Sequence, residues 1–411
     1  MKIGVNLFNL TTDSGGVSQY VLTLLQHWPR VFPHDRFVLF CFAHNADLLA
    51  AVPAEHERRL FVTQDEIAGS LVGIDLYFCP FNALYPRPLP LPTVVTLVDV
   101  QERFFPDFFS REALRLRFHH YDWSVVMADR VITISDFSRS SLVRLLGAAP
   151  ERTDRIHLCA AELPTEGAKP AAWPDGNCDP FLLYPANFWP HKNHAALLTA
   201  LARLRTERLC VSAVFTGSLL GREAEWSAQV ESAGVRDHVR HLGLVSRAEL
   251  VWLYRQARLL CFPSLFEGFG IPLVEAMRMG TPIVCAATTS LPEIAGPAAR
   301  YFDPNRPEEI ARVVAHLWND ANGRARLATQ GRIRGRRFTA ERLVREHRTS
   351  FLRALRFYSP ARHAQRVAWT TLPDSQRESL SVRERLTAAE LLRSGCPSRW
   401  RRWRRILRID P

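Results

Sequence analysis

Hydrophobic and polar positions alternate along the chain, up to about residue 355, in a way that predicts strands and helices in turn. Short, continuous apolar runs are typical of strands that are buried on both faces of a sheet. Apolar residues three and four positions apart are typical of amphipathic helices. In the first half, the predicted strands are residues 2–8, 37–42, 76–79, 93–98 and 130–134, and the predicted helices are residues 17–28, 111–128 and 137–146.

A segment rich in proline and glycine, residues 164–180, separates this half from a second series of the same kind. Such a composition is typical of linkers. Strand and helix alternation favours parallel sheets with helices on both faces, so we expect two α/β domains with a ligand crevice between them. In the second half, the predicted strands are residues 181–184, 211–216, 259–262 and 282–286, and the predicted helices are residues 194–204, 250–257, 272–279 and 307–318.

Length and composition agree with this two-domain interpretation. The 411 residues, 47% of them hydrophobic and 23% charged, are too many for one compact core and too apolar for a disordered chain. We expect no membrane span, because no apolar window is long enough. We also expect no secretory signal, because a strand pattern begins at Lys2. The eight cysteines include no CxxC pair, which favours reduced thiols in a cytoplasmic protein.

The basic residues are distributed unevenly by type and by position. The net charge is +12, but only Lys2, Lys169 and Lys192 are lysines, so each lysine is more informative than a typical arginine. Residues 357–411 hold 12 arginines against five acidic residues, with Trp400, Trp403 and Leu407 on one helical face. This tail fits an anionic membrane surface or a solvated extension equally well. Nucleic-acid binding is disfavoured, because no recognition fold accompanies the charge.

The segment that follows the predicted strand ending at Phe262 carries the strongest chemical signal. Gly268 and Gly270 allow a tight turn close to a ligand, and Pro272 suits the beginning of a helix. The unpaired amides and the positive dipole of that helix start form a site for an anion such as a diphosphate.

Two carboxylates flank this predicted anion site. We expect Glu275, which we place in the first turn of the helix, to accept from the vicinal hydroxyls of a ribose. We expect Glu267, in the preceding loop, to accept from hydroxyls of an attached sugar. Two structural alternatives remain open: Glu275 complements the helix dipole, and Glu267 is a solvent-exposed loop residue.

These words of sequence resemble a known family. Glu267 and Glu275 match the E-x7-E motif of retaining glycosyltransferases, and FPSLFEGFGIPLVEAM, GTPIV, TTSLPEIAG and YPANFWPHKNH are similar to glycosyltransferase family 4. The likeness also includes TTDSGGVSQY, TLVDVQERFFPDFFS, ADRVITISDFSR and HVRHLGLVSRAEL, in family order. It implies the GT-B fold, with two Rossmann-like doubly wound domains facing across a cleft, and a basic C-terminal extension.

The resemblance also implies domain boundaries. Residues 1–163 would bind the acceptor, residues 164–180 would link the domains, and residues 181–340 would bind the nucleotide sugar. Residues 341–356 would form a helix that packs back on the N-terminal domain. Residues 357–411 would form the Arg-rich tail.

Family roles transfer onto matching positions of this sequence. Glu275 would bind the ribose, Glu267 the donor sugar near the reacting centre, and Lys192 the diphosphate. The implied catalytic residues are Glu267, Lys192 and Asp99. The implied donor-binding residues are Gly15, Gly16, Asn187, Lys192, Leu244, Val245, Glu267, Gly268, Phe269, Gly270, Ile271 and Glu275.

Two positions depart from the family pattern. Many relatives have an arginine where this chain has Asn187, so Lys192 and the helix start would carry more of the diphosphate charge. Many also have a histidine where this chain has Val98, which leaves Asp99 as the neighbouring candidate for an acceptor contact. Asp99 could instead cap its loop.

The resulting prediction is a retaining hexosyltransferase. It would move a sugar, with mannose from GDP-mannose as our choice, onto a glycan hydroxyl during bacterial surface polysaccharide or O-antigen assembly. The acceptor would be a glycan or a lipid-linked oligosaccharide. No D-x-D or clustered metal ligands occur, so we expect no metal and no cofactor. The alternative is a non-catalytic GT-B subunit that binds nucleotide sugar or scaffolds other transferases.

Overall fold

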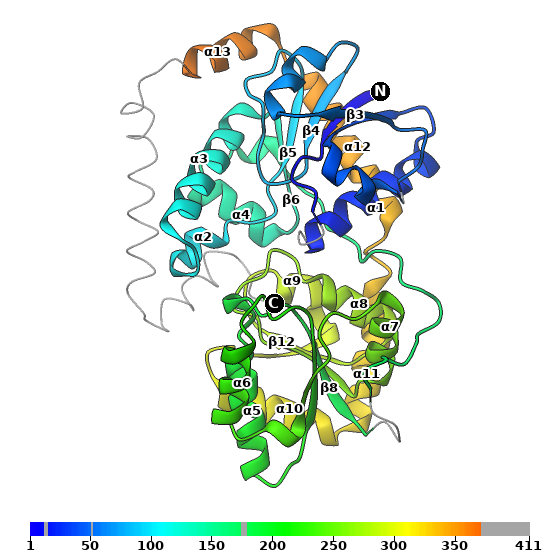
Figure 1. Ribbon diagram of the computed structural model, residues 1–411, viewed down its shortest axis with the longest axis vertical. Coiled ribbons are helices and arrows are strands. Elements are labelled where there is room, and N and C mark those ends of the chain that lie inside the picture. Colours follow the sequence, from blue (N-terminus) through cyan, green and yellow to red (C-terminus); the bar gives the residue numbers. More distant parts are fainter. Residues whose placement is uncertain (12–14, 51, 174–178, 371–411) are drawn as a thin grey trace. The chain divides into compact units, whose positions relative to one another are not determined.

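The computed structural model describes residues 1–11, 15–50, 52–173 and 179–370, which fold into two compact units (Figure 1). Of the described residues, the first unit holds those of Met1–Leu158 together with residues 340–370, and the second holds those of Cys159–Thr339. The segment that we predicted as a linker, residues 164–180, therefore lies within the second unit. The Arg-rich tail beyond residue 370, with its predicted helical face, is outside the described residues.

The first unit is built on a parallel sheet with the strand order β3-β2-β1-β4-β5-β6-β7. Its strands are β1 (Lys2–Asn6), β2 (Arg36–Phe42), β3 (Glu57–Phe61), β4 (Leu76–Cys79), β5 (Thr93–Thr96), β6 (Arg130–Thr133) and β7 (Thr153–Arg155). Its α-helices are α1 (Gly15–Val31), α2 (Gln101–Phe104), α3 (Arg111–Met127), α4 (Asp136–Leu145), α12 (Ala340–Phe357) and α13 (Pro360–Thr370). Short 3-10 helices are η2 (Ala43–Leu49), η3 (Gln64–Ser70), η4 (Pro106–Phe108) and η5 (Pro150–Arg152).

The second unit has a parallel sheet of the same kind, with the order β10-β9-β8-β11-β12-β13. Its strands are β8 (Phe181–Pro185), β9 (Ser212–Thr216), β10 (Val239–His241), β11 (Leu259–Phe262), β12 (Ile283–Ala286) and β13 (Ala299–Phe302). Its α-helices are α5 (His194–Thr206), α6 (Glu223–Ser232), α7 (Arg247–Gln256), α8 (Ile271–Met279), α9 (Leu291–Ala295), α10 (Pro307–Asn319) and α11 (Ala321–Gly335). Short 3-10 helices are η6 (Pro190–Lys192), η7 (Arg236–His238) and η8 (Gly296–Ala298).

The strands that the hydrophobic pattern did not predict lie at or beside the sheet edges. The edge strands β3, β7 and β10 have the sequences ERRLF, TDR and VRH, and their side chains are largely exposed or half-buried. An edge strand has one neighbour and faces water, so charged residues are tolerated there and the apolar signal disappears.

Aromatic side chains attach α12 to the core of the first unit, although α12 follows the entire second unit in the sequence. Trp28 of α1 stacks on Phe351 of α12 with ring centroids 5.4 Å apart, and Phe78 of β4 lies 5.0 Å from the same ring. All three rings are buried, so α12 contributes to the hydrophobic core rather than covering it from outside.

A buried hydrogen-bond network reinforces this attachment. The Nε2 atom of His347 on α12 lies 2.6 Å from the hydroxyl of Tyr20 on α1, and that hydroxyl lies 3.0 Å from Oγ1 of Thr96 on β5. The other ring nitrogen of His347 bonds the carbonyl of Leu343. Because burial disfavours the charged imidazolium, the pKa of His347 falls to about 4. His347 is therefore neutral when the unit is folded.

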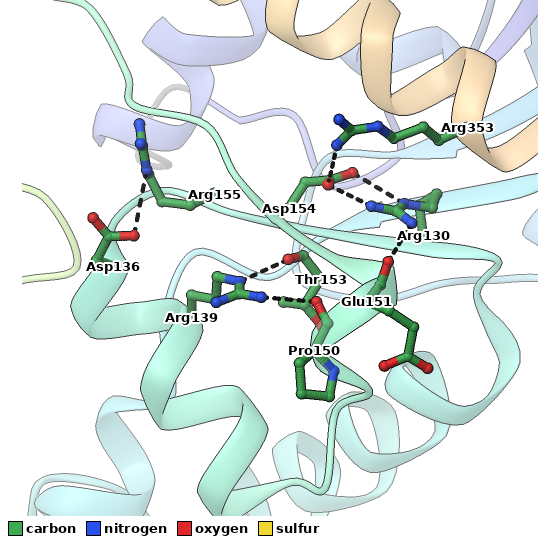
Figure 2. Close-up of a pocket in the computed structure, with 9 residues that line it drawn as sticks. All are labelled: Arg130, Asp136, Arg139, Pro150, Glu151, Thr153, Asp154, Arg155 and Arg353. Carbon is green, nitrogen blue, oxygen red and sulfur yellow. Dashed lines mark hydrogen bonds and ion pairs between the residues drawn. The ribbon is translucent and has the colours of Figure 1, made fainter. Parts of the chain in front are cut away.

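An ion-pair network beside edge strand β7 provides a third attachment (Figure 2). Asp154 accepts from Arg130 of β6 at 3.0 Å, and from Arg353 and Ser350 of α12 at 2.8 Å each. Arg139 of α4 donates to the Thr153 carbonyl at 2.8 Å. All of these residues except Ser350 line a cavity of about 450 Å³, and their charged groups bond one another and the backbone. We therefore interpret this polar cavity as a structural feature that joins α4, β7 and α12.

The burial of His347 predicts a pH dependence of stability. The unfolded chain takes up a proton on this histidine near pH 6.5, whereas the folded chain resists it down to about pH 4. Stability is thus fully present above pH 6.5 and falls as the pH drops towards 4, by about 2–3 kcal/mol for this group. Urea unfolding at a series of pH values, followed by tryptophan fluorescence, measures the slope.

The matched variant is His347→Gln, which keeps a hydrogen-bonding side chain but does not titrate. We expect a shallower loss of stability between pH 6.5 and 4 than in the wild type, even where its stability at pH 7 is lower. An unchanged slope would show that other groups dominate the acid sensitivity.

Candidate active site

The strand order of the second unit reverses between β8 and β11, and the loops that leave these two strands hold the central charged pair. Lys192 follows β8 and Glu267 follows β11. The Nζ atom of Lys192 lies 2.6 Å from Oε1 of Glu267, and the two side chains are only 16% and 12% exposed. Ligands of open α/β sheets bind where the strand order reverses, at the carboxyl ends of the strands.

The loop after β8 holds Lys192 rigidly. The hydroxyl of Tyr184 donates to the Lys192 carbonyl at 2.5 Å. Asn193 adopts a left-handed conformation, with φ +59°, and its side-chain amide donates to the carbonyls of Pro263 and Pro304. An asparagine tolerates this conformation better than most residues. Its bond to the Pro263 carbonyl fixes the end of the Lys192 loop against the loop after β11.

The loop after β12 fixes the backbone around Glu267. The Glu267 amide donates to Oγ1 of Thr289 at 3.1 Å, and the Ser290 hydroxyl donates to the carbonyls of Glu267 and Phe269. Thr289 has φ +52°, which is unfavourable for a β-branched residue. Strain of this kind persists where the surrounding contacts over-determine the backbone, and it concentrates at functional sites.

The start of α8 has the tight glycine turn that the sequence predicted. Gly270 precedes α8 with φ +99°, and Gly268, Phe269 and Ile271 complete the turn that leads into the helix. A Cβ atom on Gly270 would lie 2.8 Å from Cδ2 of Leu291, so both conformation and space require glycine. Pro272 has no amide hydrogen, and the Leu273 amide donates to the Gly270 carbonyl at 3.0 Å, so the α8 start offers an anion mainly the positive end of its dipole rather than a full turn of unpaired amides.

Glu275 lies deeper than the sequence pattern predicted. It is the fifth residue of α8, and the first turn contains no acidic residue, so the prediction that it lies on the first turn is wrong. The Glu275 side chain is buried, and its Oε2 accepts from the hydroxyl of Tyr254 on α7 at 2.9 Å. Burial raises the pKa of Glu275, an effect that the Tyr254 hydrogen bond and the charges of Arg247 and Arg278 partly offset.

Three further predicted donor residues lie on loops at the same edge of the sheet. Asn187 uses its side-chain oxygen to accept from the Ser218 amide at 2.9 Å, which joins the loops after β8 and β9. Leu244, in the loop after β10, is 78% exposed, and its neighbour Val245 is half-buried. An exposed leucine beside a polar site provides an apolar surface for a planar ring.

The remaining predicted residues belong to the first unit and are described within it. Gly15 and Gly16 begin α1, directly after β1 and its loop, and Gly15 has φ +51° with open space around it. Residues 12–14 of that loop are outside the described residues. Asp99 lies after β5 and accepts from the Gln101 amide at 3.1 Å, as in the loop-capping alternative. Val98 is buried.

Two histidines next to Lys192 do not add positive charge. Burial, with a smaller contribution from the Lys192 charge, lowers the pKa of His191 to about 3. Burial likewise lowers the pKa of His194, which is surrounded by Tyr184, Phe188 and other rings, to about 3. Lys192 is therefore the cationic side chain of this loop at neutral pH.

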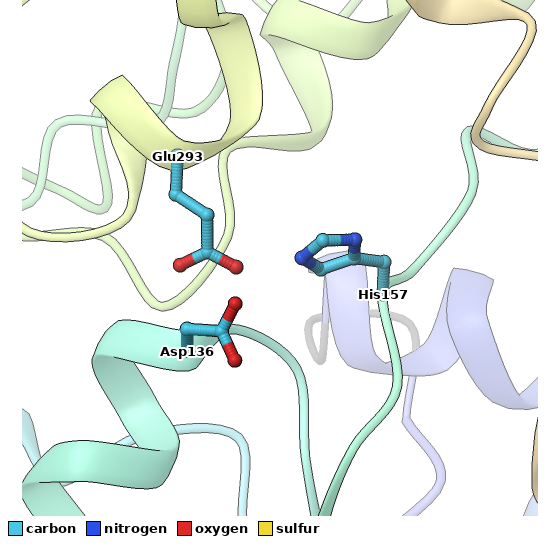
Figure 3. A group of neighbouring side chains, drawn as sticks. All are labelled: Asp136, His157 and Glu293. Carbon is cyan, nitrogen blue, oxygen red and sulfur yellow. The ribbon is translucent and has the colours of Figure 1, made fainter. Parts of the chain in front are cut away.

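Figure 3 draws a further group of potential metal-ligating side chains. Asp136, the first residue of α4, and His157, which follows β7, have ligand atoms within 4.8 Å of each other in the first unit. Asp136 also pairs with Arg155 at 3.5 Å. Glu293, labelled in the same figure, belongs to α9 of the second unit. We infer no metal site from these side chains.

Sequence reasoning missed the residues that support Glu267 and Glu275. Thr289 and Ser290 lie in the TTSLPE words that carried the resemblance, so a signal existed but no role was assigned. Arg247 likewise lies in the segment HVRHLGLVSRAEL that carried the resemblance, without an assigned role, whereas Tyr254 gave no signal, because a tyrosine on an amphipathic helix is typical of many surfaces. Only tertiary packing of α7 against α8 shows that they lie near Glu275.

Comparison with protein families and with known proteins indicates what this chain is similar to. A model of the family described as glycosyl transferases group 1 matches residues 169–334. O-antigen chain mannosyltransferase B of Escherichia coli is 30% identical over 259 residues, which are 60% of this chain and 67% of that protein. MMP alpha-(1->4)-mannosyltransferase of Mycolicibacterium hassiacum is 31% identical over 208 residues, 50% of this chain and 49% of that protein.

Solved structures share the fold. Anabaena Alr3699/HepE in complex with UDP and glucose has a TM-score of 0.64 at 20% identity, over 85% of this chain and 98% of that chain. Sucrose-phosphate synthase from Thermosynechococcus elongatus has a TM-score of 0.67 at 18% identity, with the same coverage of each chain. With the two parallel sheets, these likenesses confirm the prediction of two Rossmann-like units and the GT-B fold.

The geometry of the α8 start predicts the effect of replacing Gly270. We expect Gly270→Ala to be destabilising for two reasons, the positive φ and the approach of the new methyl group to Leu291. Gly221→Ala is the matched control, since Gly221 has φ +74° with nothing within 4 Å of the added atom.

Conformational strain alone costs about 1–2 kcal/mol, and overpacking adds about 1–3 kcal/mol at Gly270. Thermal unfolding of both variants measures the difference. Equal losses of stability would show that the Leu291 side chain moves away from the new methyl group at no cost in free energy of unfolding.

Proposed function

Because the chain belongs to the family of glycosyl transferases group 1, we propose that it is a retaining hexosyltransferase that uses a nucleotide-diphosphate sugar and a glycan hydroxyl. The observation that carries this proposal is the Lys192–Glu267 pair, 2.6 Å apart, beside the α8 start. One cation, one carboxylate and a helix N-terminus provide complementary contacts for a diphosphate and for sugar hydroxyls.

The proposed reaction follows from these groups. The bond between the anomeric carbon and the diphosphate oxygen breaks, and a bond from that carbon to the acceptor oxygen forms on the same face. The acceptor proton passes to the departing phosphate oxygen. Lys192 and the α8 start neutralise the charge that grows on the leaving group, so these contacts are stronger in the transition state than in the ground state.

Donor binding would also rearrange the charged pair. A diphosphate competes with Glu267 for the Lys192 ammonium, because both are anions within reach of the same cation. As Lys192 turns to the phosphate, the Glu267 carboxylate becomes available to accept from hydroxyls of the donor sugar. The pair thus keeps both groups oriented until the donor arrives.

The donor and acceptor assignments rest on the named relatives. We choose mannose from GDP-mannose, since both relatives described above are mannosyltransferases by name. The O-antigen relative supports a glycan or lipid-linked oligosaccharide of a bacterial surface polysaccharide as acceptor. We assign the acceptor contact to Asp99 and the approach to the diphosphate from the first unit to Gly15 and Gly16.

We further propose that transfer needs no metal and takes place in the cytoplasm, at the inner face of the membrane. Lys192 and the α8 start supply the charge neutralisation that a divalent cation would otherwise provide. Arg366 is buried against Asp129, but the ten arginines of residues 371–411 support attraction to anionic lipid. In the described part of the chain, no helix has the length and apolar character required to cross a bilayer. Turnover that persists in EDTA would support the metal-free assignment.

Replacement of Lys192 tests the proposed function directly. We expect Lys192→Ala to lose sugar transfer by a factor of about 10²–10³, since a charge that stabilises the leaving group is removed. Lys169→Ala is the matched control, because Lys169 is an exposed lysine of the same unit. Transfer and donor hydrolysis are measured over a panel of GDP, UDP and ADP sugars with glycan acceptors. Full activity of Lys192→Ala would overturn the assignment, and binding without turnover in the wild type would favour a non-catalytic subunit.

Replacement of Glu267 separates nucleotide binding from sugar transfer. We expect Glu267→Gln to bind a free nucleoside diphosphate more tightly, roughly fivefold, because Lys192 no longer has a competing carboxylate. The same variant should transfer sugar more slowly, since an amide accepts from the donor hydroxyls more weakly. Calorimetry with the diphosphate and a transfer assay measure the two effects. Weaker diphosphate binding would contradict the proposed exchange of partners.

A further inference from the structure

Buried Glu275 and partly buried Arg247 carry opposite charges, and each has a polar atom that the contacts within the protein leave available. Arg247 is close enough to lower the pKa of Glu275, but the carboxylate bonds the Tyr254 hydroxyl through Oε2. The Nη2 atom of Arg247 is buried and has no hydrogen-bond partner among the described residues. The second carboxylate oxygen, Oε1, has no hydrogen bond to Tyr254.

Tyr254 determines how the Glu275 carboxylate is oriented. The ring is fully buried, and burial, together with the charge of Glu275, raises the pKa of Tyr254 far above its ordinary value, so its hydroxyl is the donor. The Tyr254 carbonyl in turn accepts from Oγ1 of Thr281 at 2.6 Å, just beyond the end of α8. These two bonds join α7 to the middle of α8 and to the residue that follows its C-terminal end, and the first of them orients the carboxylate.

A buried donor without a partner is unusual and calls for an explanation. Leaving such a group unsatisfied costs about 1–3 kcal/mol, and most buried polar atoms in folded proteins are paired. A guanidinium near a buried carboxylate would gain from pairing with it. Tyr254 instead bonds Oε2 of that carboxylate. The Nη2 donor of Arg247 and the Oε1 acceptor of Glu275 therefore suit a ligand that offers both an acceptor and a donor.

We propose that Tyr254 and Arg247 complete a nucleoside subsite around Glu275, in which Tyr254 positions the carboxylate for the ribose hydroxyls and Arg247 donates to the nucleoside. This inference rests on the proposed function, because it takes the ligand to be the nucleotide of a sugar donor. Tyr254 is a positioning residue, and Arg247 is a binding residue.

A nucleoside fits these groups better than other parts of the donor. The vicinal hydroxyls of a ribose donate to a carboxylate, and the base and the ribose carry oxygen and nitrogen acceptors for a guanidinium. Arg247 begins α7, three residues after Leu244, whose exposed side chain offers an apolar surface for the base. The diphosphate already has Lys192 and the α8 start, at the other end of the site.

The test for Tyr254 compares a nucleoside diphosphate with its 2′,3′-dideoxy analogue, by calorimetry on the full chain. We expect the wild type to bind the ribose form more tightly, and Tyr254→Phe to reduce that preference roughly fivefold or more, since the carboxylate loses its fixed orientation. Tyr301→Phe is the control, because it removes a partly buried hydroxyl that bonds the Gly296 carbonyl in the same unit. A Tyr254→Phe variant that keeps the full preference overturns the positioning role.

The test for Arg247 compares a nucleoside diphosphate with inorganic pyrophosphate. We expect Arg247→Gln to weaken the nucleoside diphosphate about tenfold and to leave pyrophosphate binding unchanged. Arg255→Gln is the control on the same helix, since Arg255 is exposed and bonds the Thr165 carbonyl. An equal loss for both ligands would show that Arg247 acts on the phosphates, and no loss would show that it binds neither; each result overturns the assignment of Arg247.

The wild type separates failure of this inference from failure of the proposed function. If the wild type binds no nucleoside diphosphate, the proposed donor site itself is wrong. If it binds the diphosphate but does not prefer the ribose form, the donor site stands and the ribose role of Glu275, with its support from Tyr254, is wrong.

Discussion

A parallel sheet whose strand order reverses leaves two neighbouring loops that run in opposite directions from its carboxyl edge, and this constraint governs the site of the second unit. Strands β8 and β11 are neighbours in the sheet, so the loops that follow them start side by side. Lys192 and Glu267 on these loops therefore lie 2.6 Å apart, although 75 positions separate them in the sequence. The α8 start faces the same edge because the chain enters the helix directly from the β11 loop. The strand order alone therefore brings Lys192, Glu267 and the start of α8 to one edge of the sheet.

Several arginines of the chain serve structure, whereas Lys192, one of only three lysines, lies in the candidate site. Arg130 and Arg353 attach α12 through Asp154, whereas His191 and His194 stay neutral beside Lys192 because burial lowers their pKa to about 3. One ammonium in a loop without competing cations is a specific partner for a diphosphate. A site lined with arginines would attract anions less selectively.

The sequence predicted much of this arrangement and failed where burial could not be read from it. Apolar runs located the central strands, but β3 and β10, at the sheet edges, carry charges and were missed. The predicted glycine turn is present, with Gly270 in a left-handed conformation, and Glu267 pairs with Lys192, while the donor-binding roles of the two glutamates stay predictions. Glu275, however, is buried and held by Tyr254 rather than lying on the first turn of α8, because the packing of α7 on α8 decides its surroundings.

The sequence by itself determined the local chemistry: which loops hold glycine, where a helix begins, and that Lys192, Glu267 and Glu275 carry the charges. These follow from backbone conformation and residue type, which act over a few neighbouring positions. Only the tertiary structure decided which side chains from distant segments contact one another. It paired Lys192 with Glu267, placed Tyr254 against Glu275, left a buried nitrogen of Arg247 without a hydrogen bond to any described residue, and brought α12 into the core of the first unit. Such contacts depend on the packing of distant segments, which no short pattern encodes.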